Sequence, residues 1–198
     1  MGRGHVCLRP THGYHDRVSG QEQRVLGVDP GLAHLGIGAV LERGRDGELL
    51  LARLVRTRPS DEAGLRLEQV HEAMLAAIDA SRPDAIAIEG QYFHRQREAS
   101  FKVGQAVGVI LLAAHARGVP VHTYGPLEVK QTLVGSGRAD KAQVAYMVRA
   151  LLGRSATGGD VPHHVSDALA LALTHLARRR LDAHAPPARA GRGGLPRP

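Results

Sequence analysis

Acidic residues end two apolar runs of this sequence, and a third acid follows a histidine near the C-terminal end. Asp29 closes R-V-L-G-V-D, Glu89 closes A-I-A-I-E, and Asp167 comes three residues after His164. Short apolar runs of this kind predict buried strands, and ligand sites favour the carboxyl ends of such strands. Residues three apart on a helix share a face. We therefore expect three carboxylates and one imidazole to converge.

Such a cluster predicts a divalent metal site. Like charges a few ångströms apart resist simultaneous ionisation, and a cation removes that penalty. Oxygen ligands suit Mg²⁺ or Mn²⁺, and two ions about 3.5–4 Å apart can clamp the attacking and leaving oxygens of a phosphodiester. We expect two ions per subunit, bridged by Asp29, and hydrolysis by an activated water. Singly, each acid also has a local explanation, as a turn, a strand end or a helix start.

The segment directly after Glu89 carries groups that suit DNA. Arg95 and Arg97 fit a role along the phosphate backbone, which positions DNA without reading its sequence. Tyr92 and Phe93 suit stacking on an unpaired base, and we expect one of them to stack. The alternatives are arginines that serve solubility and aromatic residues that belong to the core.

Composition favours a nucleic-acid partner and gives no sign of a membrane. Lysine and arginine number 26 against 19 acidic residues, a net charge of +7 with the 12 histidines neutral. A coding bias toward arginine is the alternative source of that charge. No window approaches the roughly 20 apolar residues of a membrane span, and the first residues lack the apolar run of a secretory signal. The single cysteine, Cys7, excludes a disulfide framework, so we expect a cytoplasmic protein.

The 198 residues suit one domain between two tails. We expect a disordered leader over 1–23, a folded domain over 24–182 and a flexible basic tail over 183–198. An α/β fold is expected within the domain, with three antiparallel strands followed by alternating helices and strands. Gly104 and Gly108, one turn apart on an apolar helix, mark a candidate dimer seam. The expected strands are 24–29, 36–41, 48–55, 85–89 and 119–124, with a turn at 44–47, and the expected helices are 62–80, 100–117, 141–152 and 165–181.

Four blocks of this sequence, in order, resemble those of the RuvC family of Holliday junction resolvases. They are V-L-G-V-D-P-G with Gly36 five residues after Gly31, then I-A-I-E-G-Q-Y-F, then V-K-Q-T-L-V-G-S-G-R-A-D-K-A-Q-V, then H-H-V-S-D-A-L-A-L-A-L-T-H. Together they span about residues 24–178. The third block is too long and particular to match by chance.

The resemblance implies a ribonuclease H-like fold, with a mixed five-stranded sheet flanked by helices, and a homodimer. It implies symmetrical metal-dependent nicking of four-way DNA junctions in homologous recombination and repair, with RuvA and RuvB as branch-migration partners. Two lysines resemble family lysines near the scissile phosphate, where a cation offsets developing charge. The implied catalytic and metal residues are Asp29, Glu89, His164 and Asp167, joined by Lys141 in catalysis and by Lys130 and Lys141 in DNA binding.

Some members of the family place a carboxylate at the position of His164, while others carry a histidine there. A histidine can ligate a metal through a neutral nitrogen, which shifts preference toward Mn²⁺, or it can carry a proton. His163 or Asp160 could take either role instead, and a solvated loop residue is the remaining alternative.

Other functions remain open at this point. A non-catalytic junction-binding module would keep the basic surface without the metal site, and a related nuclease could act on RNA. A phosphotransferase of the actin and sugar-kinase type also opens on a strand and an Asp-x-Gly turn, but it needs two lobes and this chain supplies one.

Overall fold

The computed structural model describes residues 22–90, 97–153 and 161–184, without the side chains of 97–99 and 184. Tyr92, Phe93, Arg95 and Asp160 lie outside the described residues, and so does the side chain of Arg97. The roles expected for these residues therefore stay predictions, as do the expected leader and tail.

Five strands form one mixed sheet in the described part of the chain, in the order β3-β2-β1-β4-β5. β1, β2 and β3 are antiparallel, as expected, and β4 and β5 join parallel to β1. The β2–β3 turn is shorter than expected, because the strands extend to Arg43 and from Asp46 and leave Gly44 at φ 60°. The strands are β1 Arg24–Asp29, β2 His34–Arg43, β3 Asp46–Arg56, β4 Ala85–Glu89 and β5 Val121–Tyr124.

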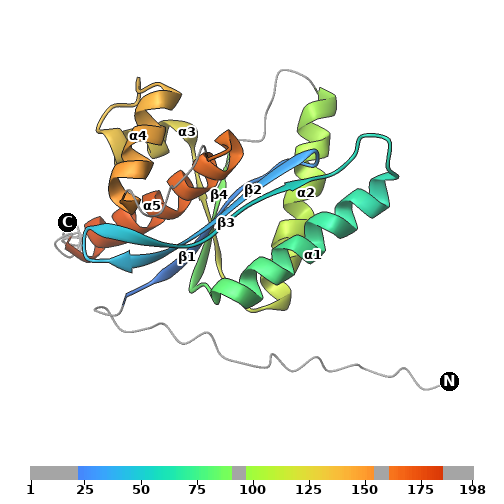
Figure 1. Cartoon of the computed structure of the whole chain (residues 1–198), viewed down its shortest axis with the longest axis horizontal. Coiled ribbons are helices and arrows are strands. Elements are labelled where there is room, and N and C mark those ends of the chain that lie inside the picture. The colour runs from blue at the N-terminus through green and yellow to red at the C-terminus, as the bar shows by residue number, and fades with distance from the viewer. Residues whose placement is uncertain (1–21, 91–96, 154–160, 185–198) are drawn as a thin grey trace, which may run out of the picture.

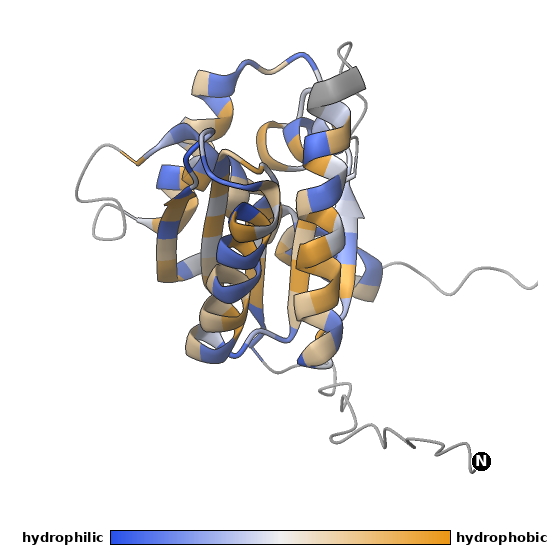
Figure 2. Cartoon of the chain, turned by 90° about the vertical axis from the view of Figure 1, so that its right-hand side faces the viewer, coloured by the Kyte–Doolittle hydropathy of each residue, from blue (hydrophilic) through white to orange (hydrophobic). Residues whose placement is uncertain are grey.

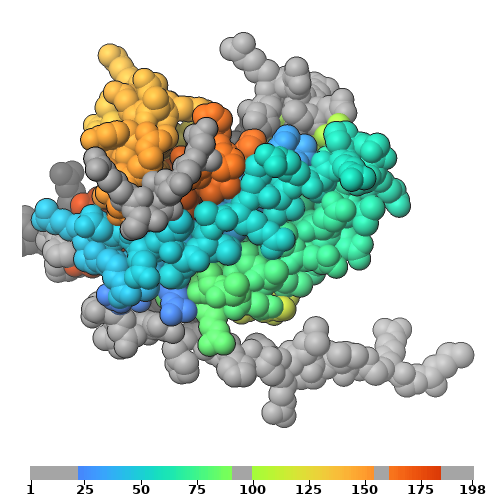
Figure 3. All heavy atoms as spheres, viewed as in Figure 1, coloured from blue at the N-terminus to red at the C-terminus, as the bar shows by residue number. Residues whose placement is uncertain are grey.

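Helices cover both faces of the sheet (Figure 1). α1 and α2 pack on one face and α3, α4 and α5 on the other, each side with its own apolar core. Atoms of the β2–β3 hairpin separate α4 and α5 from α1 in the space-filling view (Figure 3). No helix in the described part is long and apolar enough to cross a membrane. The helices are α1 Ala63–Ser81, α2 Arg97–Ala116, α3 Pro126–Val134, α4 Lys141–Leu152 and α5 His163–His184.

Alternation along the strands decides which side chains reach α5. Successive residues of a strand point to opposite faces. Leu26 and Val28 of β1 therefore pack toward α1 and α2, whereas Val25 packs toward α5. Gly27 and Asp29 share the face of Val25, so the carboxylate at the end of β1 lies on the α5 side.

The helix α3 was not anticipated from the sequence. Proline at its first position and Gly135 after its end, at φ 81°, are the usual signals for where a helix begins and ends. α4 starts at a capping box. The backbone N–H of Gln143 donates to Asp140 Oδ1, and the backbone N–H of Asp140 donates to Gln143 Oε1. This cap fixes Lys141 as the first residue of α4.

A buried arginine supports the turn after β1 through a chain of two hydrogen bonds. Arg66 Nε donates to Thr57 Oγ1 at 2.9 Å, and that hydroxyl donates to the Leu32 carbonyl at 2.6 Å. Arg66 and Thr57 are 8% and 7% exposed, so these bonds lie away from competing water. The turn that follows Asp29 is thereby tied to the start of α1.

Candidate active site

Asp29 and Glu89 end neighbouring parallel strands. β1 and β4 pair with Val28 opposite Ile88, and each acid is the next residue of its strand, so Asp29 and Glu89 lie side by side at the same edge of the sheet. Ala87 packs in the core beneath α5, and alternation places Glu89 on that same side. The two strands are therefore neighbours, which is the condition for their terminal carboxylates to meet.

Glycines let α5 approach the sheet closely enough to bring its polar residues to Asp29. A Cβ added at Gly27 would stand 1.8 Å from the Ala168 carbonyl oxygen, and one added at Gly36 would stand 2.0 Å from that of His164. Only residues without a side chain permit such approach of a helix backbone. The backbone of α5 therefore rests directly on β1 and β2 at the point where it carries His164.

Two polar contacts tie the acids to neighbouring groups. His164 Nδ1 donates to Asp29 Oδ2 at 2.7 Å, and Lys141 Nζ lies 3.4 Å from Asp167 Oδ2. The Asp29 side chain is 15% exposed and that of Lys141 is 80% exposed, so the first contact is sheltered and the second is open to solvent. His164 lies inside α5, which excludes the alternative that it is a loop residue.

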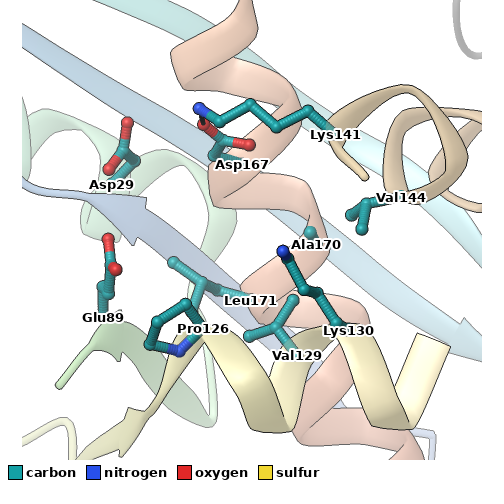
Figure 4. Close-up of a pocket in the computed structure, with 10 residues that line it drawn as sticks. All are labelled: Asp29, Glu89, Pro126, Val129, Lys130, Lys141, Val144, Asp167, Ala170 and Leu171. Atoms are coloured by element: carbon teal, nitrogen blue, oxygen red, sulfur yellow. Dashed lines mark hydrogen bonds and ion pairs between the residues drawn. The ribbon is translucent and has the colours of Figure 1, made fainter. Parts of the chain in front are cut away.

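The three carboxylates border one pocket (Figure 4). Asp29 comes from β1, Glu89 from β4 and Asp167 from α5, and the two lysines named from the sequence reach the same pocket from α3 and α4. The sequence motifs therefore converge in space. The pocket is lined by the charged residues Asp29, Glu89, Lys130, Lys141 and Asp167 and by the apolar residues Pro126, Val129, Val144, Ala170 and Leu171.

Burial raises the pKa of Asp29 above its ordinary value, and the nearby charge of Asp167 raises it further. The hydrogen bond from His164 and the charges of His164 and Lys141 act in the opposite direction. Two carboxylates that repel each other beside a partly buried pocket are stabilised when a cation joins them. The electrostatics of the pocket thus favour binding of positive charge.

Another histidine, which sequence reasoning missed, lies beside this group. The imidazole of His34 is parallel to that of His164, with ring centroids 5.3 Å apart and an angle of 4° between the planes. His34 begins β2 five residues after Asp29, and its place on the face of Gly36 is a signal that only the strand register makes visible. His163, the alternative to His164, is exposed.

Tyr124 and His175 form a buried polar pair next to Glu89. Tyr124 is opposite Glu89 in the β4–β5 register, and its hydroxyl lies 2.8 Å from His175 Nδ1. Burial raises the pKa of Tyr124 to about 12 and, with the charges of His122 and Arg179, lowers that of His175 to about 4.

The family model of the crossover junction endodeoxyribonuclease RuvC matches residues 25–175, which include every acid of this pocket. The chain belongs to the RuvC family. RuvC of Thermus thermophilus is 44% identical over 160 residues, which cover 79% of this chain and 95% of that protein. RuvC of Salinispora arenicola is 42% identical over 175 residues, which cover 86% and 99%.

Solved structures agree with this assignment. Thermus thermophilus RuvC in complex with a Holliday junction substrate superposes with a TM-score of 0.75 at 43% identity, over 81% of this chain and 96% of that one. The yeast mitochondrial Holliday junction resolvase, at 12% identity and a TM-score of 0.61 over 82% of each chain, shares the fold. The expected ribonuclease H-like fold is confirmed.

RuvC nucleases depend on a divalent metal, and the donor set of this pocket fits one. Three carboxylates supply the hard oxygen ligands that such ions prefer. Among the described residues, no group of three acids, histidines or cysteines is close enough together to hold a metal ion. The ammonium of Lys141 lies beside the Asp167 carboxylate instead. Asp29, Glu89 and Asp167, which line the same pocket, are the residues that would hold the cation.

Proposed function

We propose that this chain is an endonuclease that resolves four-way DNA junctions by metal-dependent hydrolysis of phosphodiesters. The observation that carries the proposal is the meeting of Asp29, Glu89 and Asp167 from three elements at one pocket, in a chain of the RuvC family. A RuvC relative of similar fold was solved with a Holliday junction. Membership of an endonuclease family and the retained acids favour this function over a non-catalytic binding module.

We propose a role for each of the site residues. Asp29, Glu89 and Asp167 would hold Mg²⁺ or Mn²⁺, two ions per subunit, and His164 would join them through the ring nitrogen that does not face Asp29. The bound metal supplies polarisation of the phosphodiester and activation of water. Lys141, whose ammonium lies beside Asp167, offsets negative charge that develops on the phosphate. Lys130 lines the same pocket, and we expect it to contact the DNA backbone.

Replacing Asp29 with asparagine tests the chemistry separately from binding. Asp29→Asn removes one ligand charge and leaves the basic surface intact, so cleavage of a synthetic four-way junction should fall by at least about 100-fold while junction affinity stays. The matched control is Asp46→Asn, the same charge change at the exposed β2–β3 turn at the opposite end of β2. Undiminished cleavage by Asp29→Asn would overturn the assignment.

Substrate class is tested by offering the protein a junction, a duplex of matched sequence and an RNA hybrid with Mg²⁺ or Mn²⁺. We expect symmetrical nicks in the junction and little cutting of the others, and chelation of the metal should abolish cutting. Preferential cleavage of the RNA strand would favour a ribonuclease instead. For each tenfold rise in salt concentration, the logarithm of the junction affinity should fall by about 0.9 per neutralised phosphate.

We propose a homodimer built on the exposed face of α2. Phe101, Leu111 and Leu112 are 66%, 44% and 59% exposed, and Gly104 and Gly108 on the same side have open space at their Cβ positions. The hydropathy view turns α2 toward the reader, with hydrophobic residues along it (Figure 2). An apolar helix face suits self-association, and a two-fold dimer offers two equivalent sites to a two-fold junction.

Sedimentation of a single variant tests the dimer. Leu112→Asp should shift the protein to monomers at micromolar concentration, because a charge would be buried in the seam. Leu181→Asp is the matched control, since Leu181 is 60% exposed near the end of α5. A wild-type monomer at that concentration would contradict the proposal. RuvA and RuvB as partners, and a cytoplasmic location, are proposed from the family resemblance.

A further inference from the structure

His34 is positioned to control the orientation of His164. The two rings are parallel, and their centroids are 5.3 Å apart. Stacked rings attract one another, so each opposes rotation of the other away from the stack. The His164 side chain is 45% exposed, so solvent alone would let its imidazole swing away from Asp29.

The backbone of His164 is held by the same strand. Gly36 lies two residues after His34 and therefore on the same face of β2. An added Cβ at Gly36 would stand 2.0 Å from the His164 carbonyl oxygen and 2.4 Å from its carbonyl carbon, which shows that the first turn of α5 rests on this strand. Strand β2 thus supports the main chain of His164 at Gly36 and its ring at His34.

The third support of the imidazole is Asp29. This residue is the register partner of Gly36 in the β1–β2 ladder, and its carboxylate accepts from His164 Nδ1 at 2.7 Å. With Nδ1 donating to Asp29, the other ring nitrogen of the neutral imidazole is left as an acceptor. Loss of the stack would leave one hydrogen bond to hold a half-exposed ring.

We propose that His34 is a positioning residue, which stacks on His164 and keeps its imidazole directed at Asp29 within the active site. The inference rests on the proposed role of His164 in cleavage. His34 acts through the other ring, so an aromatic side chain without nitrogen serves equally well. This separates positioning from direct contact of His34 with phosphate or metal.

Substitution by phenylalanine and by alanine distinguishes these roles. In single turnovers at saturating junction and metal, His34→Ala should slow cleavage about fivefold, the range expected for one lost stack, while junction affinity changes less than about twofold. His34→Phe should stay within about twofold of wild type. His71→Ala, on α1 across the sheet, is the control histidine and should leave the rate unchanged. If phenylalanine is as damaging as alanine, the stacking role is overturned.

A double-mutant cycle identifies which residue mediates the effect. In the His164→Ala background, His34→Ala should slow cleavage no further, because there is no ring left to orient. If His164→Ala itself cleaves at the wild-type rate, the proposed role of His164 fails. If His164→Ala is slow and His34→Ala multiplies the loss by the same factor as in wild type, the role of His164 stands and the present inference fails.

Proton chemical shifts of the metal-free protein give a readout that is independent of cleavage. A ring that stacks on His34 experiences its ring current, so the ring protons of His164 should move toward solvent-exposed values in His34→Ala and stay displaced in His34→Phe. The backbone amide shifts of Val165 and Asp167 should change little, which a general disturbance of α5 would not allow. Unchanged His164 ring shifts in His34→Ala would overturn the inference.

Discussion

Replacing Gly27 with alanine should damage stability and cleavage together. An ideal Cβ at Gly27 would lie 1.8 Å from the Ala168 carbonyl oxygen and 2.9 Å from the Ala172 amide nitrogen, whereas real Cβ contacts under 3.0 Å essentially do not occur. Both atoms belong to the helix backbone and cannot rotate away. The first contact must lengthen by about 1.2 Å, so α5 has to move relative to β1.

The size of the effect follows from that movement. Forcing a methyl group into a packed interior costs about 1–3 kcal/mol, and here its nearest neighbours are all backbone atoms of α5, so we expect about 3 kcal/mol of lost unfolding free energy. Asp167 precedes Ala168 directly and travels with the helix. A misplacement of about 1 Å in a catalytic group can cost on the order of 100-fold in rate. Junction affinity should persist where the protein is folded.

Urea unfolding gives the stability of the variant, and single-turnover cleavage of a four-way junction gives its rate. Gly64→Ala on α1 is the control, because its added Cβ would meet only Glu62 Oε1 at 3.5 Å, an ordinary contact. Alanine in a helix is favoured over glycine by up to about 1 kcal/mol, so this control should be neutral or slightly stabilised. Wild-type stability and rate in Gly27→Ala would refute the close packing of α5 on β1.

Lys141→Ala should lower the single-turnover rate at saturating junction by about 10- to 100-fold with little change in affinity, whereas loss of affinity with intact chemistry would make Lys141 a DNA-positioning residue. His164→Asp should retain cleavage and shift metal preference from Mn²⁺ toward Mg²⁺ while His164→Ala loses much activity with either ion, and wild-type behaviour of His164→Ala would exclude a role for the imidazole. The fold holds His175 neutral with a pKa of about 4, below the unfolded value of 6.5, so its contribution to stability is complete above pH 6.5 and falls by about 3 kcal/mol as pH drops toward 4. Between pH 6.5 and 4, the unfolding free energy should fall less steeply with decreasing pH for His175→Gln than for wild type. Equal pH dependence in the two proteins would contradict a lowered pKa of His175.

Local patterns in the sequence carry much of the fold. The apolar runs that end at Asp29 and Glu89 predict buried strands because side-chain burial follows the strand period, and both strands occur with the expected ends. The long amphipathic segments likewise correspond to α1, α2, α4 and α5, with ends that differ by a few residues. α3 was missed because its 9 residues are too few for a clear helical pattern, although proline and Gly135 mark its two ends.

The residue types at the site were also legible in the sequence, since clustered carboxylates predict a bound cation. Their convergence could be expected only on the condition that the two strands are neighbours. It depends on β1 lying between β2 and β4, and on glycines that let α5 rest against the backbone of the sheet. Contacts between residues more than a hundred positions apart, such as Asp29 with His164, follow from how layers pack.

His34 shows the boundary between the two kinds of information. By itself it is one histidine among 12, with no periodicity or motif to set it apart. The β1–β2 register places Gly36 opposite Asp29, and alternation then brings His34 to the side where α5 presents His164. Sequence alone determined the strands, most of the helices and the chemistry of the acids, because these depend on neighbours along the chain. Tertiary structure decided which of these groups touch, because that depends on the close packing of a helix backbone against a sheet.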